Sequence, residues 1–255
     1  MCAIHQPNLF PRLSTLAKFF AADRWIVLDD VQFARRDYQH RARLAFLDDP
    51  GRQQWLTLPT NLAHGRATTI RQARLAEPCR SRRTVKLLVR QYYGRSRHWD
   101  AVREVLDAVL DTLDTTDRVA NVTRTSTIAL LAALGWSGEV LDSNEIPTRR
   151  GRSERLADLA AATGSTHYLC GTGGLRYLDV GPFDARGVPV LPFQTPVDTD
   201  DPLWQWARRI SSLWALSQIG PEALANRLDT REKLASVSSR RDHRDQAAPH
   251  RISRS

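Results

Sequence analysis

Cysteine is scarce in this 255-residue sequence, and its three cysteines lie far apart. Cys2, Cys79 and Cys170 form no CxxC or CxxH pair, so the sequence offers no spacing suited to a zinc site. An odd and scattered set also argues against a disulfide framework and indicates a reducing compartment. We therefore expect a cytoplasmic protein without a metal site.

A long hydrophobic run is also missing. No apolar stretch approaches the roughly 20 residues that span a bilayer, and Pro7 and Pro11 interrupt the start, where a signal segment would need an apolar core. Hydrophobic residues make up 42% of the chain and charged residues 25%, as in ordinary globular domains. These features predict a soluble globular protein with no membrane partner.

Acidic residues are outnumbered, and the formal net charge is +9. Residues 231–255 hold seven Lys or Arg and three Asp or Glu, so they contribute +4 of that charge. Their Ser- and Arg-rich composition predicts a disordered basic tail after a domain at 1–230. The tail either binds polyanions weakly or is a solvated extension. Because it lacks interleaved aromatic residues and any recognisable module, nucleic acid is the least favoured partner.

Short apolar runs alternate with helical patterns along residues 1–230. We expect strands at 2–5, 24–28, 54–58, 139–141, 166–170 and 188–193, with another near Ile70. We expect helices at about 13–22, 81–93, 102–113, 119–134, 152–162, 203–216 and from 221 to 228. This order predicts an α/β fold with a mostly parallel sheet flanked by helices, and a helix-rich insertion or subdomain at 81–135.

Two motifs near the start of the chain are specific in composition and spacing. Residues 4–11 read IHQPNLFP, and residues 28–33 read LDDVQF. Later segments read SERL at 153–156, YLCG at 168–171 and YLD at 177–179. Together they resemble the WbqC-like protein family, and the resemblance covers about residues 3–228. It implies a biosynthetic role, with the joining of an acyl group to an amine as the expected reaction.

The chain departs from the family pattern at four positions. His40 stands where the family usually has Asn, and Arg12 stands where Trp is usual. Cys170 replaces a common Ser, and Trp214 replaces an Asp. The sequence does not decide whether the His40 and Trp214 departures change substrate recognition or reduce function.

The candidate catalytic residues follow the first two expected strands. His5 ends the first strand, and Asp29 and Asp30 end the second. Carboxyl ends of parallel strands share one edge of a sheet, where ligands gather. A neutral histidine can accept a proton from an attacking amine, and a carboxylate can hold that amine. Only one of the adjacent aspartates should enter the site, and we favour Asp30. The alternative is a satisfied strand-end histidine beside carboxylates that close a loop.

Further polar residues are candidates for substrate binding. Neutral amides could orient a carbonyl group, arginines could hold an anionic donor, and glycines allow backbone N–H groups to approach an anion. This set consists of Gln6, Asn8, Gln32, Arg41, Arg43, Gly171, Gly173, Gly174 and Tyr177. Arg35 and Arg36 fit a solvated basic loop better. Cys170 is a weaker candidate as a nucleophile than as a small buried strand residue.

The leading hypothesis is an amide-forming N-acyltransferase of specialised-metabolite or surface-polysaccharide biosynthesis. It would join an activated acyl group to the amine of an amino acid or amino sugar. The donor would be a CoA or phosphopantetheinyl thioester, with an acyl carrier protein as a candidate partner and no tightly bound cofactor. A nucleotidyltransferase-like enzyme acting on a phosphorylated substrate and a non-catalytic binding module for a carrier protein remain open. The sequence defines neither the donor, the acceptor nor the oligomeric state.

Overall fold

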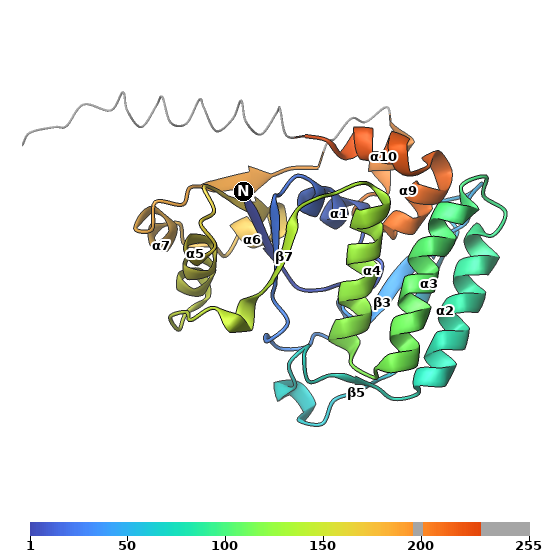
Figure 1. The fold of residues 1–255 in the computed structure, drawn as a ribbon, viewed down its shortest axis with the longest axis horizontal. Coiled ribbons are helices and arrows are strands. Elements are labelled where there is room, and N and C mark those ends of the chain that lie inside the picture. The colour runs from blue at the N-terminus through green and yellow to red at the C-terminus, as the bar shows by residue number, and fades with distance from the viewer. Residues whose placement is uncertain (196–200, 231–255) are drawn as a thin grey trace, which may run out of the picture.

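A five-stranded parallel sheet forms the centre of the protein (Figure 1), seen in a computed structural model that describes residues 1–195 and 201–230. Its strands are β1 (Cys2–His5), β2 (Arg24–Val27), β7 (Glu139–Asp142), β8 (Tyr168–Gly171) and β9 (Val190–Phe193). Helices pack on both faces, so the predicted α/β fold with a mostly parallel sheet is confirmed. The tail predicted at 231–255 lies outside the described residues.

The strand order places β1 in the middle of the sheet. Across the sheet the strands run β7-β2-β1-β8-β9, which is 3-2-1-4-5 when the five strands are numbered along the chain. The chain therefore builds outward on one side of β1 and then crosses to the other side at β8. We call the carboxyl ends of β1 and β8 the switch point. Ligands bind at this position in doubly wound sheets of this order.

Pairing between β1 and β8 is shorter than elsewhere in the sheet. Its register consists of Cys2 beside Tyr168, at the start of both strands. The other neighbouring strands pair along all four residues. The ladder is therefore incomplete toward the switch point.

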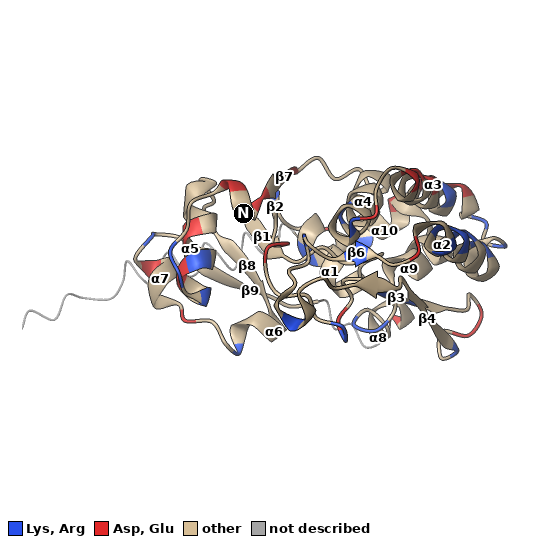
Figure 2. Ribbon diagram, turned by 90° about the horizontal axis from the view of Figure 1, so that it is seen from below, with Lys and Arg blue, Asp and Glu red and all other residues tan. Residues whose placement is uncertain are grey.

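Alternate residues of the strands face two separate apolar clusters. Ala3, Val27 and Leu169 pack with the helices on the α1 side. Ile4 and Cys170 pack on the opposite side with α5 (Arg152–Ala162) and α7 (Gly181–Asp184). Figure 2 shows α5 and α7 on one side of the strands, with α1 and α2–α4 on the other. Such alternation is expected for strands that are covered on both faces.

Six helices build most of the α1 side, and Leu203 of α8 (Pro202–Gln205) also packs there. The six are α1 (Leu13–Phe20), α2 (Pro78–Tyr93), α3 (Trp99–Thr115), α4 (Val119–Ala133), α9 (Ser212–Ile219) and α10 (Pro221–Leu228). The helix-rich segment predicted at 81–135 corresponds to α2–α4, and its buried residues belong to the same cluster as those of α1 and the sheet. No helix among the described residues has the length and apolarity needed to cross a membrane.

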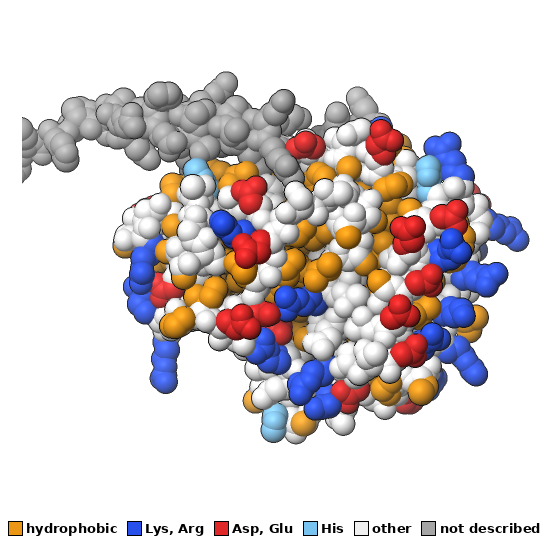
Figure 3. Space-filling model, in the orientation of Figure 1, with side chains coloured by type: hydrophobic (Ala, Val, Ile, Leu, Met, Phe, Trp, Pro, Cys, Tyr) orange, Lys and Arg blue, Asp and Glu red, His pale blue; other side chains and the backbone are white. Residues whose placement is uncertain are grey.

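Helix α3 illustrates how the sequence pattern becomes a packed element. The six apolar residues at helical spacing are all buried: Val102, Val105, Leu106, Val109, Leu110 and Leu113. The exposed face carries five acidic side chains, Asp100, Glu104, Asp107, Asp111 and Asp114. Figure 3 shows several acidic side chains over this part of the molecule. This division between an apolar stripe and a charged face confirms the predicted amphipathic helix.

Two helix ends were also predicted correctly. Helix α4 stops just before Gly135, whose φ is +72°, and α5 stops just before Gly164, whose φ is +63°. A side chain is strained at such φ values, so glycine favours the end of the helix there.

The single helix predicted at 203–216 is wrong. The chain instead forms α8 (Pro202–Gln205), then an irregular segment, then α9. The Ser211 hydroxyl accepts a hydrogen bond from the Leu213 N–H and caps α9, while the Ser211 N–H donates to the Arg43 carbonyl. The N–H of Ser212 donates to the Pro11 carbonyl. These tertiary bonds interrupt a pattern that looked continuous.

Other predicted strands need correction. Ile70 lies in a turn, where its N–H donates to the Val31 carbonyl and its side chain is buried. The segment predicted at 54–58 is β4 (Gln53–Thr57), which forms an antiparallel hairpin with β3 (Arg41–Ala45) outside the main sheet. Two short strands, β5 (Thr60–Asn61) and β6 (Arg74–Leu75), form a second antiparallel pair. Strand β3 was missed, although its alternation of arginines with Ala42 and Leu44 is a strand signal.

Candidate functional site

His5 ends β1 at the switch point, as its position in the sequence predicts. Its Nδ1 lies 2.7 Å from the carbonyl oxygen of Gln6. Its ring meets the ring of Phe19 from α1 edge-on, with centroids 5.4 Å apart. The His5 carbonyl accepts hydrogen bonds from the Leu28 N–H and the indole N–H of Trp25. These contacts fix the imidazole on the α1 side of the sheet.

The surroundings of His5 favour its neutral form. Burial is the main cause, and the positive charges of Lys18 and Arg12 add to it, so the pKa of His5 lies well below its ordinary value. The hydrogen bond with Gln6 acts in the opposite direction but is outweighed. The imidazole is therefore uncharged at neutral pH and keeps one ring nitrogen able to accept a proton.

Lys18 is the main residue that sequence reasoning missed. Its side chain is only 6% exposed, on a helix whose other buried residues are all apolar except Thr15. In residues 1–195 and 201–230 it forms no ion pair, and its ammonium group lies 5.8 Å from the centroid of the Phe19 ring. Burial lowers its pKa to about 8. One signal was available in the sequence: the chain has three lysines, at 18, 86 and 233, and Lys18 lies inside an apolar helical pattern.

The predicted glycine-rich turn follows β8, the strand next to β1 in the sheet. It forms a single helical turn, α6 (Thr172–Leu175), rather than an open loop. A Cβ added at Gly171 or Gly173 would meet no atom within 4 Å, whereas one at Gly174 would lie 2.8 Å from the Cys170 sulfur. Gly174 is thus required by packing, while Gly171 and Gly173 border open space.

Side chains of α4 form hydrogen bonds with the backbone of the segment that follows His5. Asn8 is buried, and its carbonyl accepts hydrogen bonds from the hydroxyls of Ser126 and Thr127. The Ser126 hydroxyl also accepts a bond from the Phe10 N–H, at a residue whose φ is +39°. The side-chain oxygen of Gln6 accepts a 2.8 Å hydrogen bond from Gln39. Gln6, Asn8 and Phe10 of the IHQPNLFP motif therefore use these hydrogen bonds to fix the conformation of the segment that follows β1.

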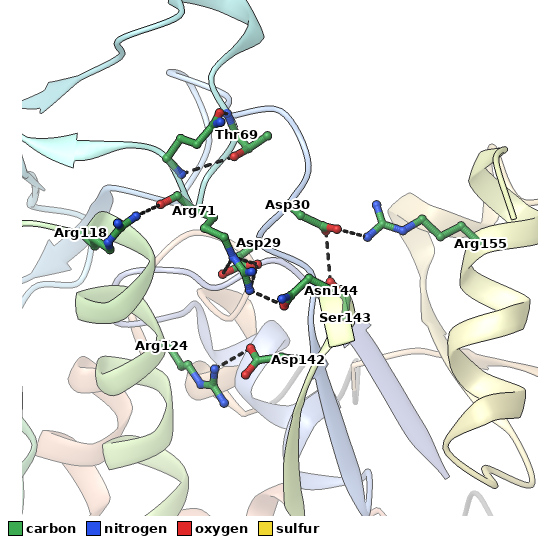
Figure 4. A network of polar contacts seen from close by, with 11 residues as sticks. Asp29, Asp30, Thr69, Arg71, Arg118, Arg124, Asp142, Ser143, Asn144 and Arg155 are labelled. Carbon is green, nitrogen blue, oxygen red and sulfur yellow. Dashed lines mark hydrogen bonds and ion pairs between the residues drawn. The ribbon is translucent and has the colours of Figure 1, made fainter. Parts of the chain in front are cut away.

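The carboxylates predicted to assist His5 lie in a separate network at the ends of β2 and β7 (Figure 4). Asp29 is 7% exposed, and its carboxylate accepts hydrogen bonds from the Nε of Arg71 at 3.2 Å. An NH2 group of Arg71 lies 3.1 Å from the same carboxylate. Arg71 also donates to the Asn144 side chain. Burial raises the pKa of Asp29, and the opposing effect of Arg71 does not cancel it.

Two further aspartates in this network have arginine partners. Asp30 pairs with Arg155 from α5 and accepts a 3.1 Å bond from the Ser143 hydroxyl. Burial alone would raise the pKa of Asp30, but Arg155 and Ser143 outweigh it, and the pKa is lowered. Asp142, which ends β7, pairs with Arg124 of α4 at 2.6 Å. We call these three aspartates and their arginines the carboxylate edge.

No hydrogen bond or ion pair in the described part of the chain joins His5 to Asp29 or Asp30. The charges that act on His5 are cationic, and each aspartate is engaged by a guanidinium group. Gln32 also lies away from His5, where its side chain donates to the Arg66 carbonyl. The structure thus groups His5 and Gln6 with the glycine turn and Lys18, and places the aspartates in their own cluster.

Arg41 and Arg43 project from β3 onto the ring of Trp55 in β4, with guanidinium carbons 4.3 and 4.4 Å from the ring centroid. Trp55 in turn contacts Tyr38, on which Arg12 stacks at 4.1 Å. None of these three arginines pairs with a carboxylate in the described residues. They form a cationic and aromatic cluster at the β3–β4 hairpin, where Arg41 also donates to the Asp37 carbonyl and Arg43 to the Gln53 side chain.

Metal ligands are not gathered at either place. Among residues 1–195 and 201–230, no group of three His, Cys, Asp or Glu side chains is arranged to hold a metal ion.

Comparison with known proteins decides the family. The WbqC-like protein family matches residues 6–224 of the chain. The chain belongs to this family. It is also 25% identical over 223 residues to the Uncharacterized protein Rv1507c of Mycobacterium tuberculosis (strain ATCC 25618 / H37Rv), a match that covers 87% of this chain and 94% of that protein. No solved structure matches the chain.

The structure locates the departures of this WbqC-like protein from the family pattern. Trp214 is buried in α9, and its indole N–H donates to the Phe46 carbonyl at 3.1 Å. His40 is buried against Phe33, and its Nδ1 has no partner among the described residues. Burial lowers the pKa of His40 to about 4. Both residues pack in the interior, so their first effect is structural.

Tyr177 lies in the YLD segment that resembles the family pattern, and none of its contacts among the described residues joins it to His5. Its ring is 68% exposed, and Arg152 lies over it at 5.5 Å. Its assignment to substrate binding stays a prediction.

Proposed function

We propose that this WbqC-like protein catalyses amide formation by transferring an activated acyl group to an amine. The observation that carries the proposal is a partly buried histidine, neutral at physiological pH, at the switch point of a parallel sheet. A general base must be unprotonated when substrate binds, which for a histidine means neutral, and it must lie where ligands bind. His5 meets both requirements, whereas the aspartates of the carboxylate edge are engaged by arginines.

The chemistry assigns His5 the proton transfer. With Nδ1 donating to the Gln6 carbonyl, Nε2 is left to accept a proton from the attacking amine. The amine nitrogen forms a bond to the thioester carbon, the carbon–sulfur bond breaks, and the thiolate leaves with a proton returned by the imidazolium. Because Asp30 is paired with Arg155, the amine would be held by groups other than a free aspartate.

The donor in this proposal is a thioester of CoA or of a phosphopantetheinyl carrier protein. The unpaired arginines at 12, 41 and 43 support it, because guanidinium groups bind phosphate and acidic surfaces. The acceptor is the amine of an amino acid or amino sugar, in specialised-metabolite or surface-polysaccharide biosynthesis. We expect the reaction to take place in the cytoplasm.

The test is a product assay by intact-mass analysis. The protein is incubated with a panel of amino acids and amino sugars together with acyl-CoA or acyl-carrier-protein donors. We expect a condensed product whose rate of formation falls at least about 100-fold in His5→Gln, the usual contribution of a general base. His64→Gln is the matched control, because His64 is exposed and far along the chain, near β5. Equal rates in His5→Gln and wild type would refute the role of His5.

A second function, nucleotidyl transfer to a phosphorylated substrate, is favoured by one observation. The 3-2-1-4-5 strand order is that of sheets which bind nucleotides at the switch point. Release of pyrophosphate from a nucleoside triphosphate, dependent on added magnesium, would support this function instead. Retention of a carrier protein with no product from any donor would support a non-catalytic binding module.

A further inference from the structure

Lys18 is a buried charge without a counter-charge in the described protein. It sits on α1, whose other buried residues are Leu13, Thr15, Leu16, Ala17, Phe19 and Phe20. None of the carboxylates in residues 1–195 and 201–230 pairs with it, although the same residues form eleven side-chain ion pairs elsewhere. A buried ammonium group is costly unless it is paired. The fold gives no structural reason for a lysine at this position.

A second cation lies close to Lys18. Arg12 lowers the pKa of both Lys18 and His5, so its charge acts on the same small region. The Nε of Arg12 is buried and has no hydrogen-bond partner among the described residues. The rest of the Arg12 guanidinium stacks on the Tyr38 ring at 4.1 Å and donates to the Arg208 carbonyl, so its Nε is the donor that remains for a ligand. Two positive charges therefore act on the neutral His5.

Open space lies on the same side of the sheet. Residues of a strand alternate between its faces, and Leu169 faces the α1 side. Gly171, two residues later, faces that side too, next to the end of β1. Because a Cβ there would touch nothing, a ligand can approach the backbone of Gly171. Lys18 lies on the same side of the sheet, since its ammonium group and the His5 ring both lie close to the Phe19 ring, at 5.8 and 5.4 Å from its centroid.

We infer that Lys18, with Arg12, binds the phosphate group of a phosphorylated substrate at the switch point. Two positive charges match the dianion of a phosphate monoester better than the single charge of a carboxylate. A lysine provides a compact point charge that suits phosphate oxygens. The phosphate could belong to phosphopantetheine, as in CoA and carrier proteins, or to a nucleotide.

This inference rests on the proposed function for the place of the donor, but binding alone tests it. Titration calorimetry with pantetheine 4′-phosphate and with pantetheine compares a probe that has the phosphate with one that lacks it. We expect Lys18→Met to raise the dissociation constant of pantetheine 4′-phosphate at least about tenfold. The dissociation constant of pantetheine should stay the same. Lys86→Met is the control, because Lys86 is exposed on α2, and it should bind both probes as wild type does.

The melting temperature separates a binding role from a structural one. If Lys18 serves a ligand, Lys18→Met should melt at the same or a higher temperature than wild type while it loses phosphate binding. A lower melting temperature with unchanged binding would overturn the inference, as would failure of wild type to bind either pantetheine 4′-phosphate or ATP. If ATP is the phosphorylated probe that Lys18→Met loses, the subsite stands and its source is a nucleotide.

The same experiments keep the two proposals apart. Binding that depends on Lys18, with no amide product from any donor, would leave the phosphate subsite standing and refute the acyl transfer. An amide product formed equally well by Lys18→Met and wild type, with unchanged affinity for pantetheine 4′-phosphate, would support the acyl transfer and refute the phosphate subsite.

Discussion

The carboxylate edge and the switch point lie at the same end of one sheet. The charged side chains are paired at the carboxylate edge and, in the part of the chain that the structure describes, unpaired at the switch point. At the carboxylate edge each of Asp29, Asp30 and Asp142 has its own arginine partner. At the switch point Lys18 and Arg12 have no carboxylate partner in the described residues, and His5 is neutral. A region whose charges are already matched serves the fold, while one whose charges are unmatched is available to a ligand.

The first way to break this comparison is to unbalance the carboxylate edge. Arg71→Met leaves Asp29 buried without its cation, and we expect a loss of about 2–3 kcal/mol in the free energy of unfolding, less than a fully buried pair would lose because Arg71 is 38% exposed. Urea denaturation measures it. Arg80→Met is the control, since Arg80 is 72% exposed and pairs only with Glu77. Equal losses in both variants would show that the edge is ordinary surface.

Removing the unmatched charge of Lys18 should increase the free energy of unfolding, whereas Arg71→Met lowers it. We expect Lys18→Met to gain about 1–2 kcal/mol in the free energy of unfolding at pH 7, because a buried unpaired ammonium group is unfavourable. Denaturation of Lys86→Met should match wild type within about 0.5 kcal/mol. A destabilised Lys18→Met would mean that the ammonium group supports the fold.

The pH dependence sharpens the same point. Burial lowers the pKa of Lys18 from 10.5 to about 8. Between these values the unfolded chain keeps the proton that the folded chain has lost, so rising pH favours the folded state of wild type. The advantage of Lys18→Met should therefore be complete below pH 8 and shrink as the pH rises toward 10.5. Comparing the two proteins at each pH isolates the contribution of Lys18, which includes its effect on the pKa of Cys2 and Cys170. A constant difference would contradict the lowered pKa.

The smallest expected change in stability comes from substituting two glycines near the switch point. Gly174→Ala places a Cβ 2.8 Å from the Cys170 sulfur, and we expect a loss of about 1 kcal/mol in thermal or urea denaturation. Gly171→Ala meets no neighbour and has an ordinary φ of −69°, so its stability should stay within about 0.5 kcal/mol of wild type. If both variants are equally destabilised, the space at Gly171 is not open.

Local pattern was enough to predict much of the fold. β1, α5 and the buried face of α3 follow from residues that are neighbours in sequence, and glycines mark the ends of α4 and α5. The break between α8 and α9 was missed because it depends on Arg43 and Pro11, which lie far along the chain.

The candidate site was predicted only in part, for a similar reason. The sequence indicates that His5 and the two aspartates end neighbouring strands, and the structure agrees. It does not indicate that Arg71 and Arg155, which lie 42 and 125 residues away from their partners, would engage those aspartates. Lys18 escaped notice because a lysine in a short amphipathic helix normally lies in solvent, and only tertiary packing shows that it is buried.

The central place of β1 has a consequence for how the protein is made. β2 pairs with one side of β1 within the first 27 residues, but β8, which covers the other side, begins at residue 168. Until that point of synthesis the second edge of β1 has no strand to pair with, and an unpaired apolar edge favours association with other chains. The nascent chain is therefore most prone to aggregate before β8 emerges from the ribosome.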